Sequence, residues 1–312
     1  MYWAIKALTE YIRATGEFAL LDLRLPDATG VEKSIRDHLA DMLRFADETV
    51  GYGAHGLCRF LSGDWSDYLD EIGARGRGES FMNSALSIIA KSRLAWVYEQ
   101  VGATAEAGRL RTEAAALRQR VEPHLTGPWY PRAFDDNGQL VGGADDRIYT
   151  EAQSWLALAK CGPPELRSRA LRETIDRCLD RAGMLIMDKP LQPNERAGRT
   201  RIPYAAGTGE NGGLWWLTGY WVSIALAEEG LRDEALRVHD ACSMDNHHRL
   251  FPSVWWSPWM CPDGIDGPAS PHYGQAQQPP GFNRESNPNE VAKFAYKLYF
   301  ATHADASRTI VW

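Results

Sequence analysis

Two short segments of the sequence place carboxyl groups beside tryptophan on glycine-containing turns. The first is Ser62-Gly63-Asp64-Trp65-Ser66-Asp67, in a loop between two expected helices. A flat indole matches the apolar C–H face of a pyranose, so Trp65 is a candidate floor for a sugar subsite. Asp67 or Asp64 would then protonate a glycosidic oxygen, if burial or a neighbouring carboxylate raises its pKa. The local alternative is that Asp64 N-caps a turn and Asp67 forms an Asx turn.

The second segment is Gly207-Thr208-Gly209-Glu210-Asn211-Gly212-Gly213, followed closely by Trp215. Its glycines allow a tight turn, and the helix expected after it offers free N–H groups to an anion or a hydroxyl. Glu210 is therefore a candidate sugar-binding or base carboxylate, with Asn211 and Trp215 as candidate substrate contacts. The alternative is a helix start at which Glu210 only satisfies N-terminal amides. A Walker-type phosphate loop is excluded, because no Gly-Lys-Ser/Thr follows.

A third pair of segments runs from Trp129 to Asp135 and from Thr150 to Trp155. We expect Arg132 simply to pair with Asp135. Glu151 has a local alternative as a helix cap, but Glu151, Gln153 and Trp155 also remain candidates for lining a cleft.

Helical periodicity dominates the rest of the chain and predicts helical hairpins. Expected helices cover 2–15, 33–49, 79–101, 104–121, 150–160, 165–182, 213–229, 231–241 and 288–303, with Thr104 as an N-cap. A small β-hairpin is expected around the Asn-Gly turn at 135–138. The irregular stretch 252–288 contains Trp256, which we expect to reach the binding cleft.

Composition narrows the class of protein further. A formal net charge of −7 argues against a nucleic-acid partner, and no apolar run is long enough for a bilayer-spanning helix. The first 16 residues lack the layout of a secretory signal, so a cytoplasmic location without membrane attachment is expected. The five cysteines contain no CxxC pair and are expected to be free core thiols. Without an HExxH motif, and with His247-His248-Arg249 better placed to bond helix carbonyls, no metal and no organic cofactor is expected.

Taken in order, these motifs resemble glycoside hydrolase family 94, the inverting cellobiose and chitobiose phosphorylases. The resemblance begins at Tyr2-Trp3-Ala4-Ile5 and continues through His55-Gly56-Leu57, the segment 62–67 and Gly78-Glu79-Ser80. It then passes through Arg132-Ala133-Phe134-Asp135, Glu151-Ala152-Gln153 and Glu210-Asn211-Gly212-Gly213, and ends near residue 255.

The resemblance implies an all-α fold, an (α/α)6 toroid that forms a single domain over 1–312. It implies further that the chain corresponds to roughly the later two-thirds of the toroid and lacks the family's upstream β-sandwich and first helices. By position, Asp67 corresponds to the general acid, Trp65 to a sugar-subsite residue and Glu210 to a contact of the acceptor sugar. Inorganic phosphate is the implied co-substrate and an oligosaccharide the implied partner; a homodimer is the assembly we consider.

Three departures from the family keep other functions in view. Ser66 stands where the family has Asn, the phosphate-holding Thr-Gly stretch is replaced by Asn283-Arg284-Glu285-Ser286-Asn287, and the loop after Pro252 resembles an insertion. An inverting hydrolase is the second hypothesis; it needs a base about 6.5–9.5 Å from the acid. Glu210 is the first candidate for that base, followed by Glu151 and Glu290. A non-catalytic protein that binds saccharide through its tryptophans is the third.

Overall fold

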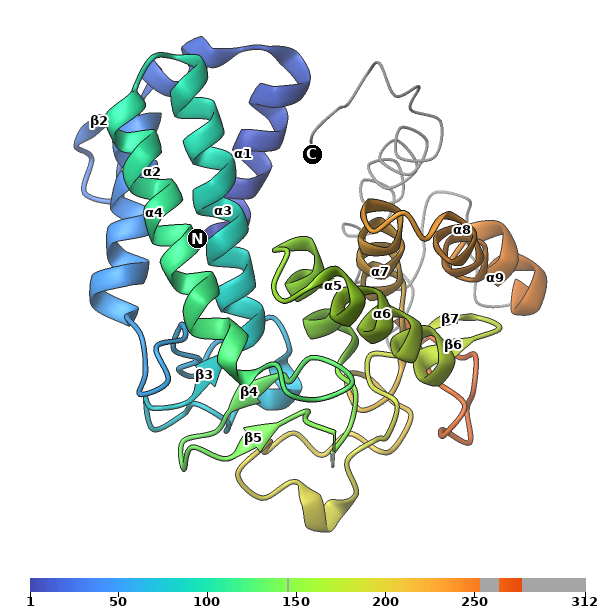
Figure 1. Ribbon diagram of the computed structural model, residues 1–312. Coiled ribbons are helices and arrows are strands. Elements are labelled where there is room, and N and C mark those ends of the chain that lie inside the picture. The colour runs from blue at the N-terminus through green and yellow to red at the C-terminus, as the bar shows by residue number, and fades with distance from the viewer. Residues whose placement is uncertain (145, 253–263, 277–312) are drawn as a thin grey trace.

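Three successive helical hairpins form the body of the protein (Figure 1). The computed structural model describes residues 1–144, 146–252 and 264–276. The hairpins are α3 (Phe81–Gln100) with α4 (Thr104–Val121), α5 (Thr150–Leu158) with α6 (Pro164–Cys178), and α7 (Trp216–Glu228) with α8 (Arg232–Ala241). Their connections are three to five residues long, which favours antiparallel packing of the two helices. The helix-rich, hairpin-based fold expected from periodicity is confirmed.

The helices form two layers. Helices α3, α5 and α7 pack in a row, and each of α4, α6 and α8 packs on the outside of its own hairpin partner. In α5, every residue from Thr150 to Ala157 is buried, as expected for a helix surrounded by protein. By contrast, α6 and α8 each bury a single stripe and expose the other side. Helix α1 (Tyr2–Thr15) extends the inner row by packing on α3.

Local sequence explains where several helices begin and end. Helix α2 (Ile35–Arg44) starts with a capping box between Ser34 and Asp37, and it continues into a π-helical turn, Phe45–Val50. Helix α1 ends at Gly16, whose φ of 75° suits glycine. The expected cap at Thr104 is wrong, because Ala103 holds that position without a side-chain bond.

Other expected boundaries also change. The predicted helix 165–182 stops at Cys178 because β6 (Leu179–Asp180) pairs with β7 (Gly183–Met184). The predicted start at 213 moves to Trp216, because β8 (Leu214–Trp215) pairs with β9 (Gly264–Ile265). Helix α9 (Met244–Leu250) was not expected, and the predicted helix 288–303 lies outside the described residues. The shorter elements are β1 (Arg24–Pro26), β2 (Glu32–Ser34) and the 3-10 turns Phe18–Asp22, Asp67–Leu69, Glu122–His124 and Pro193–Glu195.

The expected β-hairpin is present and joins two of the helical hairpins. Strand β4 (Ala133–Phe134) pairs with β5 (Leu140–Val141), and Asp135 accepts the amides of Asn137 and Gln139 in the turn. A third strand, β3 (Glu79–Ser80), pairs with β4 directly before α3. The small sheet therefore holds the start of α3 against the segment that leads to α5.

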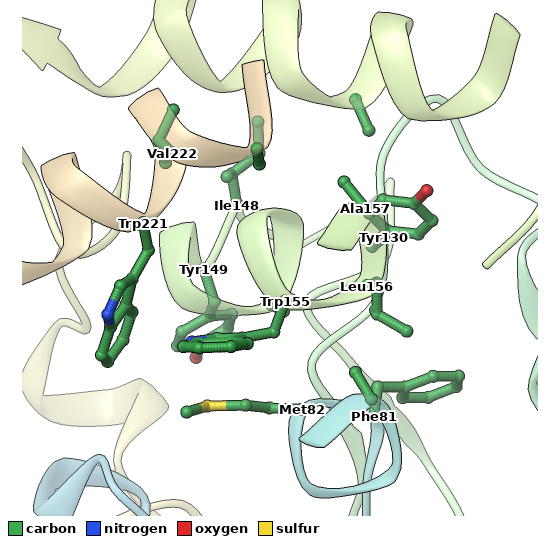
Figure 2. Close-up of a cluster of buried hydrophobic side chains, with 14 of the residues drawn as sticks. Phe81, Met82, Tyr130, Ile148, Tyr149, Trp155, Leu156, Ala157, Trp221 and Val222 are labelled. Atoms are coloured by element: carbon green, nitrogen blue, oxygen red, sulfur yellow. The ribbon is translucent and has the colours of Figure 1, made fainter. Parts of the chain in front are cut away.

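The core fills the space between the inner helices (Figure 2). Met82 from α3, Trp155 from α5 and Trp221 from α7 contribute to it and are almost fully buried. Cys58, Cys161, Cys178 and Cys242 are free and buried, as expected, whereas Cys261 lies outside the described residues. None of the described helices combines the length and the apolarity needed to cross a bilayer.

Two helix glycines give a test of this packing. A Cβ on Gly219 of α7 would lie 2.2 Å from Sγ of Cys242, so Gly219→Ala would push α7 away from the segment after α8. Such overpacking costs about 1–3 kcal/mol, a fall in Tm of several degrees. A Cβ on Gly108 of α4 would meet nothing within 4 Å, so Gly108→Ala should stabilise the exposed helix by roughly 0.5–1 kcal/mol.

Thermal unfolding of the two variants beside the unsubstituted protein checks this pair. If both alanines changed Tm in the same direction, the close approach at Gly219 would not be a packing constraint.

Candidate active site

The two carboxylates of the 62–67 loop point in different directions. The side chain of Asp64 is fully buried, and its Oδ1 accepts the amide of Ser66 at 3.1 Å. Asp67 is exposed and begins the 3-10 turn Asp67–Leu69. Asp64 thus shapes the loop from inside, while Asp67 is exposed to solvent.

Glu210 holds the loop on both sides of Asp67. Its Oε2 accepts the amide of Tyr68 at 2.6 Å and the hydroxyl of Ser66 at 3.3 Å. The residue is only 7% exposed, and burial raises the pKa of Glu210 to about 8. The amide of Tyr68 opposes this rise, and the charges of Asp67 and Glu151 add to it. Asp67 and Glu210 are therefore electrostatic neighbours, as the sequence hypothesis of a shared site requires.

The turn that carries Glu210 is fixed by its own side chains and by a distant segment. The Asn211 amide is buried and bonds the backbone of Leu191 in both directions, and also the carbonyl of Tyr204. Gly207 has a φ of 82°, and a Cβ there would lie 2.3 Å from the amide nitrogen of Ser270. The described part of the long loop, 264–276, therefore packs directly on this turn. Trp256 lies outside the described residues.

A buried arginine connects the loop to the inner helices. Arg132 is fully buried; its Nε donates to Oε1 of Glu151 at 2.8 Å, and one terminal nitrogen donates to Oδ1 of Asp64. The expected pairing of Arg132 with Asp135 is wrong, because the Asp135 carboxylate accepts amides of its own turn instead. Sequence analysis missed this partnership since both partners of Arg132 are distant in the chain.

The arginine compensates the buried Glu151 carboxylate only in part. Burial raises the pKa of Glu151, and the Arg132 guanidinium opposes only part of the rise. Oε1 of Glu151 carries the ion pair, while its buried Oε2 accepts no hydrogen bond from the described residues. For Arg132, burial disfavours the charge, but Asp64 and Glu151 outweigh it and raise the pKa above its usual value.

Gln153 is buried within the scaffold. Its Oε1 accepts the amide of Tyr130, and its Nε2 donates to the carbonyls of Tyr130 and Tyr149. Every polar atom of this amide is therefore occupied by backbone, and the side chain positions the segment that carries Arg132.

Trp65 of the loop belongs to a cluster of tryptophans. Trp65 and Trp215 are half-buried and lie edge to face with 5.9 Å between ring centroids, and Trp65 also contacts Trp221 at 5.0 Å. Trp155 and Trp3 continue this aromatic cluster beyond Trp221. A cavity of about 460 Å³ adjoins it, and its lining includes Trp3, Phe60, Ser62, Trp65 and Asn83.

Helical hairpins, with carboxylates and tryptophans gathered near the starts of their inner helices, characterise this helix-rich protein. A family model described as the glycosyl hydrolase 94 superfamily, catalytic domain, matches residues 1–280. The chain belongs to this family.

Several characterised proteins are similar to this chain over most of its length. The N,N'-diacetylchitobiose phosphorylase of Vibrio proteolyticus is 28% identical over 285 residues, which is 89% of this chain and 35% of that protein. A 3-O-beta-D-glucopyranosyl-beta-D-glucuronide phosphorylase of Paenibacillus borealis is 30% identical over 249 residues, 75% of this chain and 31% of that protein. The chain spans about a third of the length of these relatives.

Two solved structures share the fold at low sequence identity. A sialidase aligns with a TM-score of 0.63 and 13% identity, over 93% of this chain and 25% of that one. A rhamnosidase from Klebsiella oxytoca aligns with a TM-score of 0.53 and 15% identity, over 97% of this chain and 46% of that one. At these identities, the two similarities show a shared fold and nothing about function.

The raised pKa of Glu210 predicts a pH-dependent stability. A carboxyl whose pKa rises from 4.5 to about 8 on folding keeps its proton better in the folded state, so it lowers stability as pH increases between those values. At about 1.4 kcal/mol per unit, the loss amounts to a few kcal/mol by pH 8. We expect Glu210→Gln to remove much of the fall in Tm between pH 5 and pH 8, because Gln keeps an acceptor for the Tyr68 amide.

Exposed Glu106 offers a matched control, since Glu106→Gln should leave the pH dependence as it is. Equal pH profiles for Glu210→Gln and the unsubstituted protein would contradict the assignment of a protonated, buried Glu210.

Proposed function

We propose that this protein is a phosphorylase-like enzyme that cleaves β-linked, gluco-configured oligosaccharides with inversion, and that Asp67 is its general acid. Membership of the glycosyl hydrolase 94 superfamily supports the reaction class, as do relatives whose names describe disaccharide phosphorylases. The fold supports it too: the row of inner helices and the outer layer are the arrangement that an arc of an (α/α)6 toroid requires.

One observation carries the assignment of Asp67. Glu210 bonds residue 66 and residue 68, so the residue between them is held at a fixed position with its carboxyl exposed. A general acid must lie within hydrogen-bond reach of the oxygen that it protonates, and a loop held from both sides restricts where that carboxyl can go. Asp64, two positions from Ser66, is buried against Arg132 and cannot serve this purpose.

The tryptophans are the proposed sugar contacts. Trp65 lies two positions before Asp67 in the chain and lines the 460 Å³ cavity together with Trp3, so a pyranose in the cavity would contact indole rings. Asn83 and Ser62 line the same cavity and offer polar groups. Trp215, half-buried next to Trp65, is the proposed contact for a sugar on the other side of the scissile bond.

The proposed reaction needs a single protein carboxyl. An oxygen of inorganic phosphate attacks the anomeric carbon while the bond from that carbon to the glycosidic oxygen breaks. The leaving oxygen takes the proton of Asp67, and the products are a sugar 1-phosphate of inverted configuration and a free sugar. Because phosphate is the nucleophile, no protein base has to activate water.

The hydrolase hypothesis requires more of Glu210. An inverting hydrolase uses an ionised carboxylate as base, yet a pKa of about 8 keeps most Glu210 protonated at neutral pH. A protonated Glu210 donates a hydrogen bond instead, which suits a contact with a sugar hydroxyl. This favours the phosphorylase over the hydrolase.

Cleavage of a panel of β-linked glucose-containing disaccharides, with and without inorganic phosphate, tests the proposal. We expect sugar 1-phosphate only when phosphate is present. Free sugar in equal amounts under both conditions would establish hydrolysis, and saccharide binding without any cleavage would establish the non-catalytic alternative.

Asp67→Asn should lower kcat by about 10²–10⁴-fold while saccharide still binds, because the proton donor is lost and the shape is kept. Asp70→Asn is the matched control: Asp70 follows the same turn but is half-buried and paired with Arg201 at 3.0 Å. Comparable losses of kcat in both variants would refute Asp67 as the acid.

A further inference from the structure

Arg132 lies at the junction of the elements that build the site. One terminal nitrogen donates to Asp64 of the 62–67 loop, the other donates to the Ser80 hydroxyl at 3.2 Å, and Nε donates to Glu151. Its backbone accepts the amide of Phe81 at 3.2 Å and donates to Val141 at 2.8 Å. A single side chain thus joins the acid loop, the start of α3 and the start of α5.

We propose that Arg132 is the positioning residue of Asp67, which it holds in place through Asp64 and Ser66 without touching substrate. The proposal rests on the function proposed for Asp67, and it adds a residue whose role lies in the geometry of the loop.

Four hydrogen bonds connect Arg132 to the residues on either side of Asp67. The guanidinium fixes Oδ1 of Asp64, and the same oxygen accepts the amide of Ser66. The Ser66 hydroxyl then donates to Glu210, which also accepts the amide of Tyr68. Asp67 lies between the last two anchored residues, so a shift of Asp64 would move it.

Ser80 secures the loop a second time. Its hydroxyl donates to Oδ2 of Asp64 at 3.2 Å, and the same oxygen caps α3 by accepting the amide of Asn83. Both carboxylate oxygens of Asp64 are therefore held, one from Arg132 and one from the start of α3. The loop is thus tied to the start of inner helix α3 as well as to the turn that carries Glu210.

The fork geometry of the guanidinium matters as much as its charge. Its three nitrogens hold three different partners, and a lysine ammonium at the end of a flexible chain cannot reach all three at once. Arg132→Lys keeps a positive charge between two buried carboxylates and loses the fixed geometry. It therefore separates positioning from simple charge compensation.

The matched control is Arg167→Lys in the outer helix α6. Arg167 is partly buried, and it donates to Glu229 at 3.0 Å and to the carbonyl of Gly162 at 2.7 Å. Within the described residues, neither of these hydrogen bonds involves the 62–67 loop. The Arg167→Lys variant therefore measures how the loss of a guanidinium affects the fold alone.

Steady-state kinetics of the phosphate-dependent cleavage form the first arm of the test. We expect Arg132→Lys to lower kcat by roughly 10²-fold with KM within about threefold, since misplacement of a catalytic group acts mainly on the chemical step. In Asp67→Asn, the further change Arg132→Lys should have little additional effect, because Arg132 acts through Asp67. Two results would overturn the proposal. One is a double variant whose loss of kcat equals the product of the two single losses, and the other is an Arg132→Lys variant whose kcat lies within about twofold of the unsubstituted protein.

Hydrogen exchange forms the second arm and needs no activity. Arg132→Lys should speed exchange of the Ser66 and Tyr68 amides by about tenfold and leave the amides of 104–121 unchanged. In Arg167→Lys, exchange of all these amides should stay unchanged. Unchanged exchange at 62–69, or faster exchange everywhere, would overturn the positioning role. If the protein cleaves no substrate, the function proposed for Asp67 fails, and this arm alone decides whether Arg132 fixes the loop.

Discussion

A guanidinium shared between two buried carboxylates is the interaction on which the site depends. Asp64 and Glu151 have fully buried side chains, and carboxylates removed from water are costly unless they are paired and hydrogen-bonded. Arg132 supplies the charge for both and takes a further bond to Ser80. Since its partners come from a loop and from an inner helix, the same pairing that makes the charges tolerable also fixes these elements against one another.

Four carboxylates lie close to this point, and their surroundings give them different roles. Asp64 and Glu151 share the Arg132 cation. Glu210 is buried and forms no ion pair within the described part of the chain, and burial raises its pKa to about 8. Asp67 alone is exposed. Burial and charge, not residue type, thus divide the work among acids of similar intrinsic strength, as in other sites that carry out acid–base chemistry near neutral pH.

The sequence predicted those features that depend on local patterns. Helix α1 and the hairpin of β4 and β5 were predicted because amphipathic periodicity and an Asn-Gly turn act within a few residues. Long-range pairing was beyond its reach: the start of α7 moved because Leu214 pairs with Ile265, and Arg132 pairs with Asp64 and Glu151, 68 and 19 residues away. Arg132 directly precedes a short strand, a position where a charged side chain can indicate a buried ion pair. Asp135, three residues away, offered a nearer partner and concealed this pairing.

The arrangement of the inner helices also creates a positive electrostatic potential that stabilises several acidic groups in one place. Backbone bonds join the starts of the inner helices, from Phe81 to Arg132, from Thr150 to Ile186 and from Ile186 to Gly213. Helix N-termini carry partial positive charge, and an end shared by three helices favours anionic groups nearby. The carboxylates and the proposed phosphate co-substrate are both anionic, so both are stabilised by this positive potential. The positive ends of the inner helices favour these anionic groups whatever side chains surround them.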